Sequence, residues 1–99
     1  MTAKQRKEIV GLLCTAYNME LETVVNYIAN SVHLDGIRAK HIKDSLAADV
    51  TEELTHAQTL ARRIKVLEGR VPGSMALKMT QKTMQPPANP LNVKRSSKA

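Results

Sequence analysis

Aromatic residues are almost missing from this chain, and their scarcity argues against several fold classes. The 99 residues include two Tyr but no Phe and no Trp. Strand-rich domains depend on aromatic and β-branched side chains, whereas this sequence is rich in helix formers and has long stretches without Gly or Pro. The length allows one small domain at most. The composition therefore predicts an all-α protein rather than a β sandwich or barrel.

Cysteine and long apolar runs are also scarce. Cys14 is the single cysteine, so the chain cannot form an internal disulfide, and we expect a reducing compartment. No run of residues is long and apolar enough to span a membrane, and the N-terminus has no apolar region of the signal-peptide kind. We therefore expect a cytoplasmic protein without a membrane partner.

Acidic residues are missing from the last third of the chain. Every Asp and Glu lies at or before Glu68, although the net charge of the whole chain is +6. The basic excess belongs mostly to the tail, which carries Lys78, Lys82, Lys94, Arg95 and Lys98. A basic tail suits nucleic acid or an acidic partner. This one has little charge density and no aromatic residue for base stacking, so we rank nucleic-acid binding last.

The first part of the chain has the pattern of a long packed helix over about residues 3–33, with Thr2 placed to cap it. The residues of its inner face recur at steps of three and four positions. That face is formed by Ile9, Leu13, Ala16, Glu20, Val24, Tyr27 and Ser31. Glu20 lies within this face, whereas Glu22 is about 200° further round the helix. We therefore expect Glu22 to face water.

A short turn at residues 34–36, with Asp35 as a cap, leads to a second helix over about 37–68 that stops at Gly69. Glu53 and His56 lie one helical turn apart on its apolar face. The apolar residues of that face are Ile42, Leu46, Val50, Ala57, Leu60, Ile64 and Leu67. Because a carboxylate on such a face is costly without a partner, a cation is the partner that we expect.

The register of the two helices brings the candidate ligands together. Glu20 precedes the turn by roughly fifteen residues, and Glu53 and His56 follow it by roughly seventeen to twenty. In an antiparallel hairpin all three therefore lie at nearly the same height. The sequence predicts a metal site formed by Glu20, Glu53 and His56. The alternative is that Glu20 lies at the edge of the packed face and pairs with His56, or extends into solvent.

A lone hairpin of this size has too little core for stability, so we expect two copies to form a four-helix bundle. Two copies of the three ligands supply four carboxylates and two imidazoles, the donor set of a di-iron or di-manganese site. We divide the chain into a helical hairpin over 1–69 and a proline-containing basic tail over 70–99. The tail is expected to be largely extended or disordered, with a short turn around residues 74–79.

The combined pattern resembles the N-terminal half of a ferritin-like protein of the bacterioferritin type. In that family a bridging Glu is followed seven residues later by a Tyr near the metals, as Glu20 and Tyr27 are here. A Glu and a His three residues apart then precede a Leu-Glu-Gly helix end, which Glu53, His56 and residues 67–69 match. The likeness covers roughly residues 8–70. It implies iron binding at a di-iron site, with manganese as the other metal that the ligands suit.

Two departures limit what the resemblance implies. Bacterioferritins bind haem through a Met that would fall at Leu54, so we expect no haem. The usual family chain continues into two further helices that supply the other Glu and Glu-x-x-His. This chain is then either a truncated form or a half-ferritin completed by a second copy, as in the two-helix encapsulated ferritins, whose loading peptide it lacks.

Three functions remain open on the sequence alone. The first is ferroxidase-type oxidation of Fe(II) at Glu20, Glu53 and His56, with Tyr27 as a hydrogen-bonding or electron-donating residue; whether the chain is an enzyme is left open. The second is a non-catalytic helical hairpin that acts as an assembly module, its acids and His forming a buried polar network. The third is a nucleic-acid binder that uses the basic tail.

Overall fold

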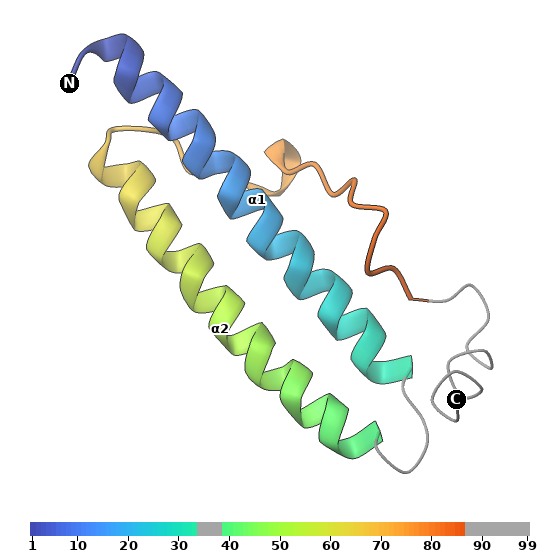
Figure 1. Cartoon of the computed structure of the whole chain (residues 1–99). Helices are drawn as coiled ribbons and strands as arrows, with labels where there is room; N and C mark the ends of the chain where they lie inside the picture. Colours follow the sequence, from blue (N-terminus) through green and yellow to red (C-terminus); the bar gives the residue numbers. More distant parts are fainter. Residues whose placement is uncertain (34–38, 87–99) are drawn as a thin grey trace.

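The computed structural model describes residues 1–33 and 39–86 of the chain. Two long antiparallel helices, α1 (Ala3–His33) and α2 (Ala39–Val66), lie side by side, and the short 3-10 helix η1 (Ser74–Ala76) follows (Figure 1). Neither described range contains a strand. The predicted all-α hairpin is confirmed. The turn predicted at 34–36 and the end of the tail, 87–99, lie outside the described residues.

The start of α1 is fixed by a reciprocal pair of hydrogen bonds. The Gln5 backbone N–H donates to Thr2 Oγ1 at 3.1 Å, and the Thr2 N–H donates to Gln5 Oε1 at 2.9 Å. This is a capping box, which satisfies two of the N–H groups that have no partner within the helix. The predicted capping role of Thr2 is confirmed, and Gln5 completes it.

The end of α2 differs from the prediction. The residue with left-handed backbone is Glu68, with φ of 62°, rather than Gly69. The Gly69 N–H donates to the Ile64 carbonyl, and the Glu68 N–H donates to the Lys65 carbonyl, both at 2.9 Å. These two bonds define a Schellman motif in which Glu68 takes the position that usually belongs to glycine. The helix therefore stops short of residue 68.

Gly69 meets a steric requirement instead. A Cβ atom at this position would lie 2.5 Å from Val10 Cγ1 and 3.0 Å from Ile64 Cγ2. Because carbon atoms in contact sit about 3.5–4.0 Å apart, no side chain fits there unless Val10 moves. Gly69 thus lets the end of α2 approach the first turns of α1.

The core of the hairpin is small. Among the described residues, the buried apolar side chains are Val24, Ala57 and Ile64, and the molecule is elongated, with principal extents of 55, 23 and 20 Å. Many large apolar side chains stay exposed, including Ile9, Leu12, Val25, Ile28, Val32, Ile42 and Leu54. Within the described residues, neither helix has a stretch apolar enough to cross a membrane.

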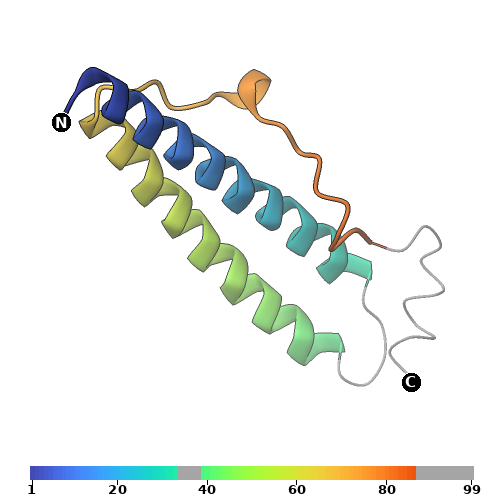
Figure 2. The same ribbon diagram turned by 45° about the horizontal axis from the view of Figure 1, so that its top comes forward.

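The segment after α2 packs along α1. Residues 77–86, here called the strap, follow the side of α1 that faces away from α2 (Figures 1 and 2). The predicted short turn within 74–79 corresponds to η1. The prediction that Glu22 faces water is wrong: its relative exposure is 7%, and its carboxylate accepts a hydrogen bond from the Gln81 backbone N–H. Helical periodicity alone could not foresee this, because the strap supplies the burial.

Candidate metal centre

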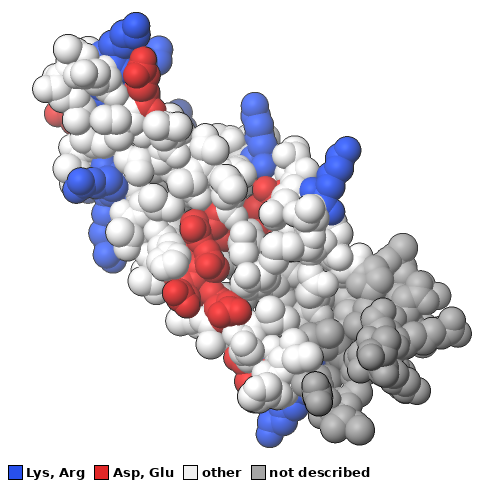
Figure 3. All heavy atoms as spheres, viewed as in Figure 1, with Lys and Arg blue, Asp and Glu red and all other residues white. Residues whose placement is uncertain are grey.

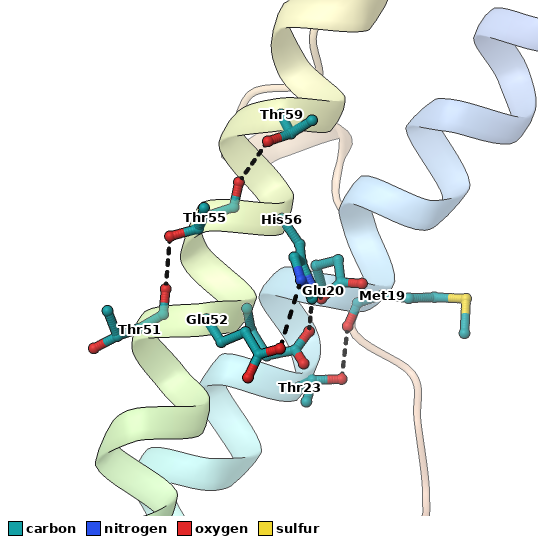
Figure 4. Close-up of polar contacts among 9 residues, drawn as sticks. Met19, Glu20, Thr23, Thr51, Glu52, Thr55, His56 and Thr59 are labelled. Carbon is teal, nitrogen blue, oxygen red and sulfur yellow. Dashed lines mark hydrogen bonds and ion pairs between the residues drawn. The ribbon is translucent and has the colours of Figure 1, made fainter.

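The three predicted ligands meet midway along the hairpin. Glu20 comes from α1, and Glu53 and His56 come from adjacent turns of α2. One ligand atom of each lies within 4.8 Å of the others. Figure 4 shows His56 on α2 and Glu20 on α1 pointing toward one another, with Glu52 below the ring. The equal height that the sequence predicts for these residues is therefore found in the structure.

The two acids face the same nitrogen of the imidazole ring. His56 Nδ1 lies 3.7 Å from Glu20 Oε2 and 3.8 Å from Glu53 Oε2. Both distances are too long for hydrogen bonds, so the contacts are electrostatic only. The side chains of Glu20 and Glu53 are 26% and 23% exposed, whereas His56 is 49% exposed. The group is thus half-buried and open on one side.

Glu20 has an unpaired oxygen. Its Oε2 atom is buried and has no hydrogen-bond partner among the described residues 1–33 and 39–86. A buried carboxylate oxygen without a donor is unfavourable by about 1–3 kcal/mol, and by more when it is ionised. This oxygen points at the other two ligands, so a cation held between the three residues would supply the missing interaction.

A third acid lies on the far side of the ring. Glu52 Oε1 is 3.9 Å from His56 Nε2, and its side chain is 67% exposed. Figure 3 shows that acidic side chains gather midway along this face, while most Lys and Arg side chains lie elsewhere on it. The site therefore has a locally negative surface in a chain with a net charge of +6.

The hydroxyls of the nearby threonines of α2 make hydrogen bonds within their own helix. The hydroxyls of Thr51, Thr55 and Thr59 each donate to the carbonyl oxygen four residues earlier in the helix (Figure 4). Such bonds are local to the helix. Tyr27 lies two turns after Glu20 on α1 and is partly buried, and Leu54, where a haem-binding Met would fall, is 42% exposed.

One polar group on α1 was not predicted from the sequence. Asn18, Glu22, Asn26 and Asn30 recur every four residues and all contact the segment that follows α2. Asn18, Asn26 and Asn30 on one face of a helix are themselves a signal, because Asn is a weak helix former whose side chain competes for backbone groups.

Comparison with protein families identifies a match over most of the chain. The model of the ferritin-like domain matches residues 10–97. The chain belongs to the ferritin-like family. A search of curated proteins and a search of solved structures found no match. The match covers α1 from residue 10 onward, all of α2 and the strap, so this ferritin-like chain has a carboxylate–histidine cluster within the matched region.

Proposed function

We propose that this ferritin-like chain binds iron and oxidises Fe(II) at a di-iron carboxylate site completed between two copies. The observation that carries the proposal is the meeting of Glu20, Glu53 and His56 from two helices, with ligand atoms within 4.8 Å of one another. Family membership supports iron as the metal.

The donor set suits iron. Carboxylate oxygens favour the hard Fe(III) ion, and an imidazole nitrogen helps to bind Fe(II). Manganese suits the same ligands. His56 offers Nδ1, the nitrogen that faces both acids. The buried, unpaired Oε2 of Glu20 gives a cation an interaction that nothing else in the described chain supplies to that atom.

A second copy supports the proposal in two ways. Three ligands from one hairpin leave coordination positions of a metal ion unfilled. Two hairpins related by a two-fold axis give four carboxylates and two imidazoles. The small core and the exposed apolar side chains on both helices leave area for a partner. Ile42 is 39% exposed and lies three helical turns before Glu53, hence on the same face.

Each residue then has a defined part. Glu20, Glu53 and His56 of the two copies would together hold the two metal ions, with Glu20 and Glu53 supplying carboxylate oxygens and each His56 one nitrogen. Two Fe(II) ions held together would become two Fe(III) ions, and their two electrons with two protons from water would reduce oxygen to hydrogen peroxide, or hydrogen peroxide to two water molecules. We assign to Tyr27, two helical turns after Glu20, the role of hydrogen-bonding a ligand carboxylate or donating an electron. The half-open site gives iron a route in from solvent, and the acidic surface draws cations toward it.

The second candidate is an assembly module without metal chemistry. It is favoured by the three acidic partners of His56, because a protonated imidazole would itself stabilise Glu20, Glu52 and Glu53. In that case the cluster fixes the register of the helices and needs no metal.

Anaerobic titration with Fe(II), with the mass of the species in solution measured in parallel, separates the two. We expect saturation near two irons per dimer, lost in Glu53→Ala. Glu52→Gln is the matched control, because it removes a neighbouring acid that is exposed on the other side of the ring, and it should keep the stoichiometry. A stable dimer that takes up no iron would support the assembly module.

A further inference from the structure

A row of polar side chains runs along the outer side of α1. Asn18, Glu22, Asn26 and Asn30, here called the polar ladder, recur every four residues, or about 6 Å along the helix. Glu22 and Asn26 are 7% and 5% exposed, and they are the buried polar side chains of the described residues. All four contact the strap, which is more than fifty positions away in the sequence.

Three members of the ladder bind the main chain of the strap. Asn18 binds both backbone groups of Lys78: its Oδ1 accepts from the N–H at 2.6 Å, and its Nδ2 donates to the carbonyl at 2.9 Å. The Glu22 carboxylate accepts from the Gln81 N–H. Asn30 Nδ2 donates to the Met84 carbonyl at 2.7 Å. The ladder thus makes hydrogen bonds with the backbone of every third residue of the strap, from Lys78 to Met84.

Asn26 contacts side chains of the strap, so it requires particular residues there. Its Nδ2 donates to Gln81 Oε1 at 3.2 Å, and its Oδ1 accepts from Gln85 Nε2 at 3.4 Å. Gln85 Nε2 also donates to the Gln81 carbonyl at 2.6 Å. Two glutamines four residues apart therefore meet one buried amide.

The chemistry of these contacts favours docking that can reverse. When the strap leaves, water can replace it at amide and carboxylate groups, whereas exposing an apolar face would be far less favourable. Met79 and Met84 are 48% and 40% exposed even with the strap in place, and Leu77 and Pro86 are only partly buried, so no apolar side chain of the strap is fully buried. Met84 also holds a left-handed backbone, with φ of 62°, which is unfavourable for a residue with a side chain.

We propose that the polar ladder is a docking groove for an extended peptide with two glutamines four residues apart. The strap occupies this groove and leaves it in an opening separate from the unfolding of the hairpin. A second peptide of the same sequence binds in its place when the strap is weakened. This inference is independent of the metal site, because it concerns the opposite side of α1.

Amide hydrogen exchange on the full chain tests the separate opening. The N–H groups of Lys78 and Gln81 are bonded to side chains of α1, so they exchange only when the strap opens. We expect Asn26→Ala to speed their exchange roughly five- to tenfold and to leave the amides around Ile64 unchanged. Thr23→Ala is the control, because the Thr23 hydroxyl bonds only the Met19 carbonyl within α1.

The proposal would be overturned if the amides of Lys78 and Gln81 exchanged at the same rate as those around Ile64. Exchange as fast as in an unstructured peptide would also overturn it. An equal effect of Asn26→Ala and Thr23→Ala would do the same.

Peptide binding tests the groove itself. A fluorescent peptide of residues 77–86 is titrated into the wild-type chain and into the full chain carrying Gln81→Ala and Gln85→Ala. Because the attached strap competes, we expect the peptide to bind the variant about tenfold more tightly than the wild type. A peptide with both glutamines replaced by alanine should bind neither. Equal binding of the two peptides, or no binding of either to the variant, would refute the groove.

Discussion

Replacing Gly69 by alanine places two physical effects in direct opposition. The φ of Gly69 lies outside the left-handed region, so alanine suits its backbone, and the lower entropy of the unfolded chain alone would stabilise the protein by about 0.4–1 kcal/mol. The new Cβ would, however, lie 2.5 Å from Val10 Cγ1, more than 1 Å inside ordinary contact. Val10 is β-branched and stiff, so the helices must shift to relieve the overlap.

Overpacking of this kind costs about 1–3 kcal/mol, so we expect Gly69→Ala to lower the free energy of unfolding by about 1–2 kcal/mol in total. For a chain of this size each kcal/mol corresponds to about 4–8 °C in the melting midpoint. Thermal unfolding followed by circular dichroism at a fixed protein concentration measures the shift.

The double variant Gly69→Ala with Val10→Ala shows where the effect arises. If the overlap is the cause, alanine at position 69 should be far less harmful once Val10 has been shortened, which a double-mutant cycle measures. A Gly69→Ala variant that is as stable as the wild type, or more stable, would refute the steric argument.

A substitution at Glu68, one residue earlier, is expected not to destabilise the protein, in contrast to Gly69→Ala. Its left-handed backbone costs about 1 kcal/mol, and asparagine visits this region more readily. The ion pair of Glu68 with Arg6, at 3.0 Å, contributes little, because the two side chains are 77% and 44% exposed. Glu68→Asn should therefore leave the melting midpoint unchanged or raise it.

Three further outcomes are expected. Thr2→Ala removes the capping box and should lower the free energy of unfolding by about 1 kcal/mol, measured by urea denaturation; an unchanged midpoint would mean that the first turn does not contribute. His56→Ala removes the nitrogen donor of the cluster and should lower the affinity for Co(II), followed by its visible absorption; equal affinities would exclude His56 as a ligand. Ile42→Lys should dissociate the proposed dimer in sedimentation, whereas Leu54→Lys, at similar exposure but about 120° round α2 from Ile42, should not. Dissociation by Leu54→Lys but not by Ile42→Lys would mean that the dimer interface lies on the side of α2 that carries Leu54.

Much of the hairpin can be predicted from local sequence. The three- and four-residue spacing of apolar side chains predicts both helices, and Thr2 predicts where α1 begins. The level of the candidate site follows from counting residues on each side of the turn, because the rise per residue of a helix is fixed. Glu20 and His56 therefore meet in the structure where the sequence predicts.

Long-range contacts decide the features that the sequence did not predict. The left-handed residue falls on Glu68 because Gly69 is taken up by its approach to Val10, a partner some sixty residues earlier. Glu22 is buried because the Gln81 N–H reaches it, although its position on the helix points away from α2.

The sequence by itself determined the two helices, their pairing and the height at which Glu20, Glu53 and His56 meet, because helical period and rise are properties of neighbouring residues. Only the tertiary structure decided that the segment after α2 lies along α1 and that Asn26 is buried against it. An exposed-looking polar side chain and a docked one have the same local sequence pattern. What separates them is a partner brought near by the path of the chain, and no local period encodes that path.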